Sequence, residues 1–251
     1  MMKKKMALLL AAALTMTTIL TGCGGGNEEN ADKQSDVTAE DAKEENASGD
    51  SVSEGGTVFT VGFDAEYPPY GYMDENGEYT GFDLELAQAV CDLEGWELVK
   101  KPINWDSKDM ELNSGSIDCI WNGFTMNGRE DDYTFSDSYV DNSQVIVVAE
   151  DSGIDTLDAL AGKVVGVQAA SAALELLQSE EEGGQKALAD TFGSLNEFAD
   201  YNTAFTELQA GALDALAIDI GVAKYQIKSR GDGYKIVDET LNTEQYAVAF
   251  K

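Results

Sequence analysis

Few kinds of side chain in this sequence could do acid–base chemistry, because the chain contains no histidine. Histidine is the commonest general base, the base of the usual hydrolase triad and a frequent zinc ligand, so those triads and most zinc sites are ruled out. A proton-transfer reaction would have to use Asp64, Asp219 or the tyrosines. We expect no catalytic residue, no metal site and no cofactor.

Three cysteines are the other reactive side chains, and Cys23 is set apart by its place in the chain. It follows three lysines and an apolar run from Met6 to Leu20 that is too short to cross a bilayer. The segment Leu20-Thr21-Gly22-Cys23 resembles the bacterial lipobox, at which cleavage before the cysteine is coupled to its acylation. We therefore expect residues 1–22 to be a lipoprotein signal peptide and Cys23 to carry a membrane-anchoring lipid. An ordinary signal peptide with a chance cysteine is the alternative.

Cys91 lies in a helical pattern and Cys119 in a strand pattern, each among apolar neighbours. Two buried thiols are the favoured interpretation. A disulfide between them, which an exported protein could form, is the alternative.

The segment after the signal, residues 23–56, is rich in Glu, Asp, Ser, Asn and Gly and has almost nothing apolar to bury. It is predicted to be a disordered acidic tether. The whole chain has a formal net charge of −31, which becomes −34 once the three signal lysines are removed. So acidic a surface argues against nucleic acid and anionic lipid as partners.

From Thr57 onward, apolar runs of strand length alternate with segments of helical periodicity. Strands separated by helices predict an α/β fold in which parallel sheets are flanked by helices. Two such runs that meet near residues 140–150 predict two lobes. The predicted strands and helices, in chain order, are 57–63, 82–90, 96–103, 107–113, 117–121, 144–149, 163–168, 171–179, 195–199, 203–210, 213–218 and 220–228.

Several short motifs follow one another in an order that resembles a known family. They are Gly62-Phe63-Asp64, Tyr67-Pro68-Pro69-Tyr70, Gly81-Phe82-Asp83-Leu84-Glu85-Leu86-Ala87, Asp118-Cys119-Ile120-Trp121-Asn122-Gly123-Phe124-Thr125, Arg129, Tyr133-Thr134-Phe135-Ser136-Asp137-Ser138-Tyr139, Leu157-Asp158-Ala159-Leu160-Ala161-Gly162-Lys163 and Gly211-Ala212-Leu213-Asp214-Ala215-Leu216-Ala217-Ile218-Asp219.

Together they look like the polar amino acid binding family of extracellular solute-binding proteins (family 3), the receptors of ABC importers. The resemblance implies a two-lobed, type II periplasmic-binding-protein-like fold. Each lobe would be a mostly parallel sheet flanked by helices, and two crossover segments would join the lobes. The expected domains are lobe 1 over 57–143, lobe 2 over 144–244, and a return to lobe 1 over 245–251.

The family binds a free amino acid between its lobes, and the resemblance assigns the two ends of that ligand. Arg129 matches the guanidinium that grips the α-carboxylate, although the loop before it is one residue shorter than usual. Asp219 matches the carboxylate that takes the α-ammonium. The alternatives are a solvated surface arginine and a helix N-cap ahead of Ile220.

Further residues of the expected ligand site come from the same resemblance. Gly123 and Thr125 match positions that contact the ammonium and carboxylate, and Ser171 and Ala172 open a helix whose free amides suit a carboxylate. The family more often has a glycine and two hydroxyl residues here, so Ala170-Ser171-Ala172 lacks one hydroxyl. The set also includes Asn122 and Gln168.

The side-chain pocket decides which amino acid binds, and the sequence leaves that open. Tyr67 and Trp105 match wall positions, with Phe124 close by, and Asp64 suits a cationic or hydroxyl group. We expect a ligand with a polar side chain.

The end of the sequence departs from the family. Residues 244–251 look like the second crossover strand, after which relatives continue through a terminal helix. The expectation is either a shortened product or a fragment, with an apolar face of the first sheet uncovered.

The favoured function is a monomeric, lipid-anchored receptor outside the cytoplasm, and not an enzyme. Its partners would be an amino acid, an ABC permease in the same membrane, and the membrane itself through Cys23, with no nucleic acid. Two alternatives remain: a dehydratase-like enzyme on the same scaffold, and a sensory or adhesive surface lipoprotein.

Overall fold

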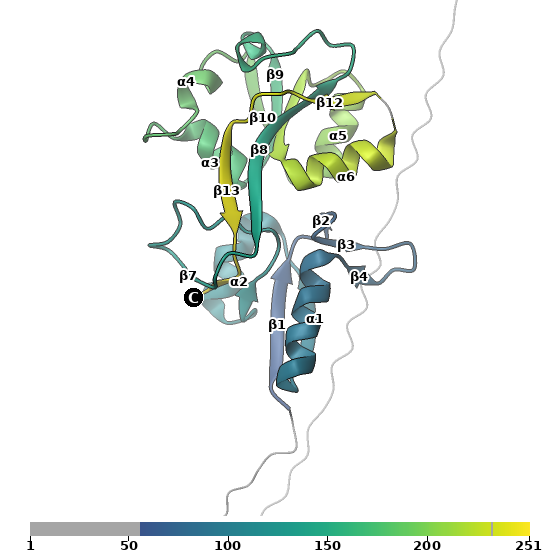
Figure 1. Cartoon of the computed structure of the whole chain (residues 1–251), viewed down its shortest axis with the longest axis vertical. Helices are drawn as coiled ribbons and strands as arrows, with labels where there is room; N and C mark the ends of the chain where they lie inside the picture. Colours follow the sequence, from purple (N-terminus) through teal and green to yellow (C-terminus); the bar gives the residue numbers. More distant parts are fainter. Residues whose placement is uncertain (1–55, 232) are drawn as a thin grey trace, which may run out of the picture. The chain divides into compact units, whose positions relative to one another are not determined.

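The computed structural model describes residues 56–231 and 233–251, so the predicted signal peptide, Cys23 and nearly all of the acidic tether lie outside the described residues. The described part contains two main sheets, each with its own helices (Figure 1). We call the part around the five-stranded sheet the first lobe and the part around the six-stranded sheet the second lobe.

The first lobe is built on the strand order β5-β1-β6-β14-β7. Strand β1 pairs in parallel with β5 and β6, and β14 runs antiparallel to β6 and β7. Three short strands form a separate small sheet beside it. The elements are β1 (Val58–Phe63), β2 (Glu66–Tyr67), β3 (Gly71–Met73), β4 (Tyr79–Thr80), α1 (Phe82–Glu94), β5 (Glu97–Pro102), η1 (Trp105–Ser107), α2 (Lys108–Ser114), β6 (Cys119–Ile120), β7 (Thr134–Phe135) and β14 (Ala249–Phe250).

Helix α1 shows why this lobe folds as it does. Leu84, Ala87 and Cys91 recur at helical spacing, and all three are fully buried. They form one apolar stripe, of which Leu84 and Ala87 belong to the same core cluster as Val61 and Phe63 of β1. Cys91 and Cys119 are both buried free thiols, as the sequence favoured.

The second lobe has the strand order β10-β9-β11-β8-β12, with β13 also paired to β8. β9 is parallel to β10 and β11, whereas β8 is antiparallel to β11, β12 and β13. The elements are β8 (Val140–Ala149), η2 (Leu157–Leu160), β9 (Val164–Gln168), α3 (Ala172–Gln178), α4 (Lys186–Ala189), β10 (Ser194–Phe198), α5 (Tyr201–Gln209), β11 (Ala215–Asp219), α6 (Ile220–Arg230), β12 (Tyr234–Ile236) and β13 (Asn242–Tyr246).

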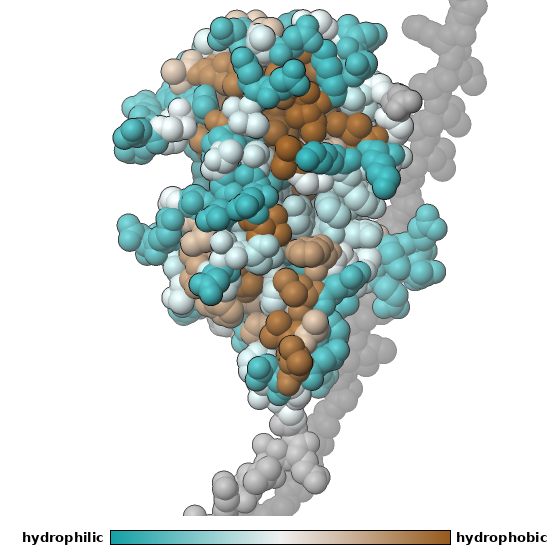
Figure 2. Space-filling model, viewed as in Figure 1, coloured by the Kyte–Doolittle hydropathy of each residue, from teal (hydrophilic) through white to brown (hydrophobic). Residues whose placement is uncertain are grey.

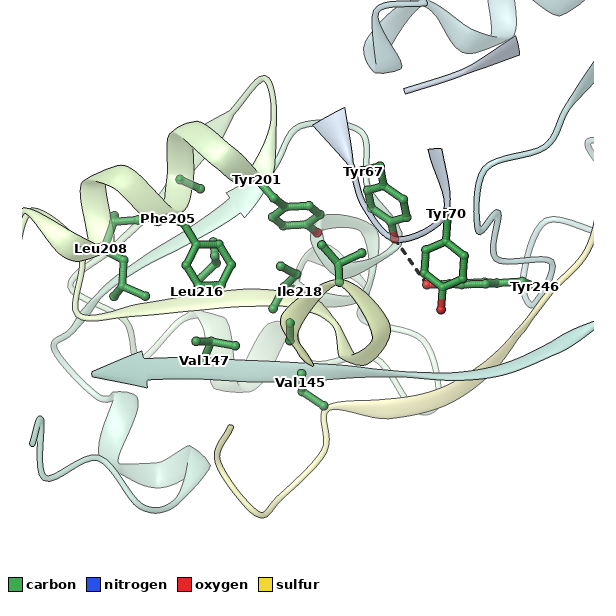
Figure 3. Packing of buried hydrophobic residues seen from close by; sticks show 14 residues of the cluster. Tyr67, Tyr70, Val145, Val147, Tyr201, Phe205, Leu208, Leu216, Ile218 and Tyr246 are labelled. Atoms are coloured by element: carbon green, nitrogen blue, oxygen red, sulfur yellow. Dashed lines mark hydrogen bonds between the residues drawn. The ribbon is translucent and has the colours of Figure 1, made fainter. Parts of the chain in front are cut away.

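The apolar run of β8 is buried on both faces of this sheet. Successive strand residues point to opposite faces, so Val145 and Val147 join one core cluster while Ile146 and Val148 join the other. Helices α5 and α6 cover the first cluster and α3 covers the second, on opposite sides of the sheet in Figure 1. Figure 3 shows the first cluster, in which tyrosines crowd one end.

The chain passes twice between the lobes. β7 belongs to the first sheet and β8 to the second, and β13 returns to the first sheet as β14. Figure 1 shows β8 and β13 of the second sheet side by side, with the first sheet beyond their lower ends. Both sheets are mixed, because the parallel βα strands meet antiparallel strands at these crossovers. The mostly parallel pattern therefore holds for the βα part of each sheet only.

Some predicted element boundaries were wrong. Helix α1 continues to Glu94, four residues past its predicted end, and β8 begins at Val140, before the predicted start at Gln144. The predicted strand 117–121 is reduced to Cys119–Ile120. The lobe boundaries at 143 and 244 stay a prediction.

Figure 2 shows brown apolar patches among mainly hydrophilic residues on the visible face. Leu93 is 85 % exposed and Met110 66 %, the two most exposed large apolar side chains of the described part. Among the described residues, no helix has the length and apolar character that a membrane span requires.

Candidate functional site

Arg129 lies in the loop that follows β6 and is held there by local backbone bonds. Its amide bonds to the Met126 carbonyl at 3.0 Å, which closes a tight turn. The side chain is buried and stacks over the Phe124 ring at 4.6 Å. Its Nη1 donates to the Thr125 carbonyl at 3.3 Å. The predicted alternative, a solvated surface arginine, does not describe this residue.

The other edge of the guanidinium faces the second lobe. Nε of Arg129 donates to Oε2 of Glu175 at 3.0 Å, and Nη2 lies 2.8 Å from Oε1. Nη2 nevertheless has no aligned hydrogen bond and is buried. The guanidinium thus already faces a carboxylate of the chain itself, in the geometry that an arginine uses to bind a carboxylate.

Asp219 is the last residue of β11 and the N-cap of α6. Its side chain makes no capping hydrogen bond to that helix. Oδ1 instead accepts from Asn142 Nδ2 at 2.8 Å, Gln144 Nε2 at 2.6 Å and the Tyr246 hydroxyl at 2.6 Å. The helix-capping alternative is therefore not what the carboxylate does. These bonds all go to Oδ1 and leave Oδ2 outside the network.

Arg129 and Asp219 line one narrow cavity between the lobes. Nine of the eleven predicted ligand residues line it, together with Phe124. The lining residues are Tyr67, Trp105, Gly123, Phe124, Thr125, Arg129, Gln168, Ser171, Ala172 and Asp219. Residues from distant parts of the sequence thus meet in one place.

Ser171 and its neighbours form the wall contributed by α3. The Ser171 hydroxyl accepts from the Leu174 amide at 3.1 Å and donates to the Gln168 carbonyl at 2.8 Å, so it caps the helix. Ala170 just before it has a φ of 54°, a left-handed backbone that glycine adopts more easily. Its carbonyl accepts from Lys108 Nζ of the first lobe at 3.2 Å.

Asp64 and Asn122 are the two predicted residues that do not line the narrow cavity. The Asn122 side chain accepts from the Asp64 amide at 3.2 Å, and so it supports the loop behind the site. Asp64 lines a neighbouring cavity of about 540 Å³ that shares Trp105 with the narrow one. Its Oδ2 accepts from Gln168 Nε2 at 2.7 Å.

The larger cavity is strongly acidic. Its lining holds five carboxylates and no lysine or arginine. The acidic members are Asp64, Glu66, Asp106, Glu197 and Asp200. Burial raises the pKa of Asp64 to about 6, although hydrogen bonds from Glu66 and Gln168 oppose the shift. The negative charges of Asp200 and Glu66 add to it.

Four buried residues near Asp219 were absent from the predicted site: Asn142, Gln144, Glu244 and Tyr246. Asn142 and Gln144 lie at i and i+2 of β8, and Glu244 and Tyr246 at i and i+2 of β13. Polar residues two apart on crossover strands point to one face and were a usable signal.

A group of tyrosines packs around Tyr67, which lines the cavity. The Tyr67 and Tyr246 hydroxyls lie 3.3 Å apart, as the dashed line in Figure 3 marks. The Tyr67 and Tyr201 ring centroids are 6.0 Å apart. Burial raises the pKa of both Tyr67 and Tyr246 well above 10, so these hydroxyls stay protonated hydrogen-bond donors at neutral pH.

Within the described residues, no group of three or more His, Cys, Asp or Glu side chains has a metal-binding arrangement. The site therefore presents one guanidinium, one partly unpaired carboxylate, aromatic walls and an acidic side cavity. Such a set of groups can hold a small zwitterion at both ends.

Comparison with known proteins gives a consistent result. Residues 59–228 match the family described as bacterial extracellular solute-binding proteins, family 3. The L-cystine-binding protein TcyJ of Escherichia coli K12 is 30 % identical over 203 residues, covering 80 % of this chain and 73 % of that protein. The arginine-binding extracellular protein ArtP of Bacillus subtilis is 31 % identical over 255 residues, covering 100 % of this chain and 87 % of that protein.

Solved structures agree with these matches. The substrate-binding protein of an ABC uptake transporter from Streptococcus pneumoniae with bound histidine superposes with a TM-score of 0.71 at 34 % identity, covering 77 % of this chain and 79 % of that one. The holo ArgBP structure from T. maritima gives a TM-score of 0.68 at 31 % identity, covering 77 % and 82 %. The predicted two-lobed α/β fold class is confirmed.

Proposed function

Because the chain belongs to family 3 of the bacterial extracellular solute-binding proteins, we propose that it binds a free amino acid between its two lobes and delivers it to an ABC importer. Family members are solute-binding proteins, and the chain is accordingly a binding protein and not an enzyme. The named relatives and structures that bind cystine, arginine and histidine support an amino acid as the ligand.

The observation that carries the proposal is the placing of Arg129 and Asp219 on one cavity. Arg129 takes the α-carboxylate of the ligand in place of Glu175, whose Oε1 lies 2.8 Å from its Nη2. Asp219 takes the α-ammonium through Oδ2. Tyr67, Trp105, Gly123, Thr125, Gln168, Ser171 and Ala172 complete the site, with Asp64 facing the side chain and Asn122 supporting it.

The ligand side chain is polar, and the acidic cavity favours a cationic one. Five carboxylates without a lysine or arginine among the lining residues attract a positive group. The Trp105 ring, which lines both cavities, adds an aromatic face for a cation.

Closure of the lobes on the ligand is part of the proposed mechanism. Arg129, Thr125, Tyr67 and Trp105 belong to the first lobe, whereas Ser171 and Asp219 belong to the second, so neither lobe alone satisfies the ligand. The hinge consists of the crossover segments 142–145 and 243–246. A ligand that contacts both lobes favours the closed form, which the permease recognises. Small-angle scattering should give a smaller radius of gyration with ligand than without.

We also propose that the protein is a monomer held at the outer face of a membrane by lipid on Cys23. The lipobox-like segment Leu20-Thr21-Gly22-Cys23 supports this proposal. Cys23→Ser should leave a protein that detergent phases no longer retain, and unchanged partition into detergent would contradict the anchor.

The ligand assignment is tested by calorimetric and thermal-shift screening of the common amino acids and cystine. Arginine and citrulline form the sharpest pair, because they differ mainly in the charge of the side-chain end.

Arg129→Ala and Asp219→Ala should each weaken binding by at least about 2 kcal/mol, since each leaves a buried ligand charge unpaired. Asp137→Ala, an exposed change away from the cavity, is the matched control. Wild-type affinity in Arg129→Ala or Asp219→Ala would show that the mutated residue does not hold the ligand charge assigned to it.

A further inference from the structure

Glu244 lies beside Asp219 in the core of the crossover region. β11, β8 and β13 are neighbouring strands, in which Asp219 is in register with Gln144 and Glu244 with Asn142. Both carboxylates are buried, with exposed fractions of 4 % for Asp219 and 5 % for Glu244. The two acids therefore lie on the same face of the sheet in rows two residues apart, and Asp219 also lines the cavity of the proposed ammonium site.

The same two amide groups bind both acids. Asn142 Nδ2 donates to Asp219 Oδ1 at 2.8 Å and to Glu244 Oε1 at 2.7 Å. Gln144 Nε2 donates to the same two oxygens at 2.6 and 2.8 Å. Two carboxylate oxygens that share both donor nitrogens lie close enough to repel each other strongly when both are ionised.

This cluster has fewer donors than acceptors. The amide oxygens of Asn142 and Gln144 are buried and have no hydrogen-bond partner. Among residues 56–231 and 233–251, no lysine or arginine nitrogen lies within ion-pairing distance of either carboxylate. Buried acceptors without donors, next to two acids without a cation, indicate a missing positive charge or proton.

We infer that Glu244 and Asp219 act as one unit that carries a proton on Glu244 in the ligand-free protein, and that the α-ammonium of the ligand displaces this proton when it binds beside Asp219. Glu244 is then a positioning residue, because it acts on the ligand through Asn142, Gln144 and Asp219. The inference rests on the proposed amino acid site.

The charge balance of the step is simple. The ligand arrives with its ammonium already protonated, no covalent bond to carbon changes, and one proton passes from the Glu244 carboxyl to solvent. The two carboxylates then share one ammonium charge. Binding therefore tightens as pH rises toward the value at which Glu244 ionises in the ligand-free protein.

The charged groups around Glu244 agree with this direction. Burial and the charge of Asp219 raise the pKa of Glu244, while hydrogen bonds from Thr125, Gln144 and Asn142 oppose the shift. The Thr125 hydroxyl donates to Oε1 at 2.7 Å.

Acids dominate the two surface cavities that Glu244 lines, and Lys224 is the one basic residue among their lining residues. The other charged lining residues are Asp141 in one cavity, and Glu175, Glu181 and Glu182 in the other. Arg129 reaches the cluster only through the Thr125 carbonyl.

The first test needs no ligand. A carboxyl whose pKa is raised in the folded state stabilises that state when protonated, and this stability is lost as pH rises through the raised pKa. Glu244→Gln should therefore gain stability relative to the wild type as pH rises, measured by urea unfolding midpoints from about pH 5 to pH 8. Glu130→Gln, an exposed change, is the control and should follow the wild type. Parallel curves for Glu244→Gln and wild type would overturn the inference.

The second test measures the proton directly, with L-arginine and L-glutamine as probes. Titration calorimetry in two buffers of different ionisation enthalpy gives the protons released per ligand bound. The wild type should release part of one proton with either probe, and its affinity should rise up to about tenfold per pH unit below the pKa of Glu244. Glu244→Gln should bind L-glutamine with an affinity independent of pH and release no proton through this pair. The same titration in Asp64→Asn shows how much of the released proton comes from Asp64, from which a cationic side chain can also displace a proton.

A third measurement covers the case in which Glu244→Gln does not fold. The infrared difference spectrum of the wild type, with ¹³C-labelled glutamate carboxyls, should lose a protonated glutamic acid band when the probe binds. Absence of that band in the ligand-free protein overturns the inference.

The outcomes separate the two proposals. Binding without proton release contradicts the inference and leaves the proposed amino acid receptor function standing. A pH-dependent stability difference without binding of any amino acid supports the proton-holding pair and contradicts the proposed receptor function.

Discussion

Arg129 and Glu175 form a two-point ion pair that joins the first lobe to helix α3 of the second. Nε to Oε2 is 3.0 Å and Nη2 to Oε1 is 2.8 Å. The Arg129 side chain is 7 % exposed and that of Glu175 54 % exposed. The chain thus offers its own carboxylate to the guanidinium that is proposed to take the ligand carboxylate, and solvent weakens that internal pair.

Glu175→Gln should tighten amino acid binding, because it removes this competing charge. Partly exposed pairs contribute about 0.2 to 1 kcal/mol, so we expect a gain of at most about fivefold and a stability change below about 1 kcal/mol. Calorimetric titration and urea unfolding measure both. Glu182→Gln, an exposed neighbour, is the control. Weaker binding in Glu175→Gln would mean that Glu175 orients Arg129 and does not compete for it.

Ala170→Gly should stabilise the protein by roughly 1 kcal/mol, because Ala170 has a φ of 54° that glycine adopts without strain. Urea unfolding gives the change in the free energy of unfolding. Ala210→Gly is the matched comparison, since Ala210 has a φ of −74° and should lose about 0.5 to 1 kcal/mol. A loss at both positions would show that the backbone at 170 is not strained.

Local sequence patterns were enough to predict the α/β class. Alternating apolar runs and helical stripes such as Leu84, Ala87 and Cys91 report directly on burial. The run 144–149 was likewise identifiable as a buried strand. Its length and direction were not, because pairing of β8 with β13 is decided by residues about a hundred positions away.

The candidate site could likewise be predicted only in part. Positions such as Arg129 and Asp219 came from an ordered set of motifs, and the structure brings them to one cavity. Glu244 was not predicted, because its contacts form only where three strands meet. The register of β8 with β11 and β13 brings Asn142 and Gln144 next to both Glu244 and Asp219. The ion pair of Arg129 with Glu175 depends on how the lobes face each other, which no local pattern encodes.

Asp83→Asn should make the protein increasingly more stable than the wild type as pH rises from 5 to 8. Asp83 is fully buried at the start of α1, where it accepts the Gly123 amide, and burial raises its pKa to about 7. A carboxyl with a raised folded pKa stabilises the fold fully below about pH 4, and this stability is lost as pH rises through about 7. Asparagine keeps an acceptor for Gly123 without a charge. The variant should therefore gain at least about 1 kcal/mol over the wild type between pH 5 and 8, measured by urea unfolding. A gain that does not change with pH would assign the effect to packing.

Gly221→Ala should hinder closure of the lobes, although alanine is the better helix former. Gly221 lies in the first turn of α6, and a Cβ there would be 2.3 Å from the Tyr70 hydroxyl oxygen and 3.0 Å from Cζ. Tyr70 belongs to the first lobe and is packed between Tyr67 and Tyr246 (Figure 3). Its ring centroid is 5.8 Å from that of Tyr67 and 5.3 Å from that of Tyr246. The methyl group must therefore displace a rigid ring or hold the lobes apart.

We expect amino acid affinity to fall by about tenfold or more in Gly221→Ala, since overpacking typically costs 1–3 kcal/mol and would act on the closed form. Calorimetry measures the affinity, and small-angle scattering should show that the radius of gyration no longer shrinks on adding ligand. Tyr70→Phe removes the nearest oxygen, so the double variant Gly221→Ala with Tyr70→Phe should recover part of the lost affinity, while Tyr70→Phe alone controls for the hydroxyl. Equal affinity in Gly221→Ala and wild type would show that Tyr70 moves aside freely and that this contact does not limit closure.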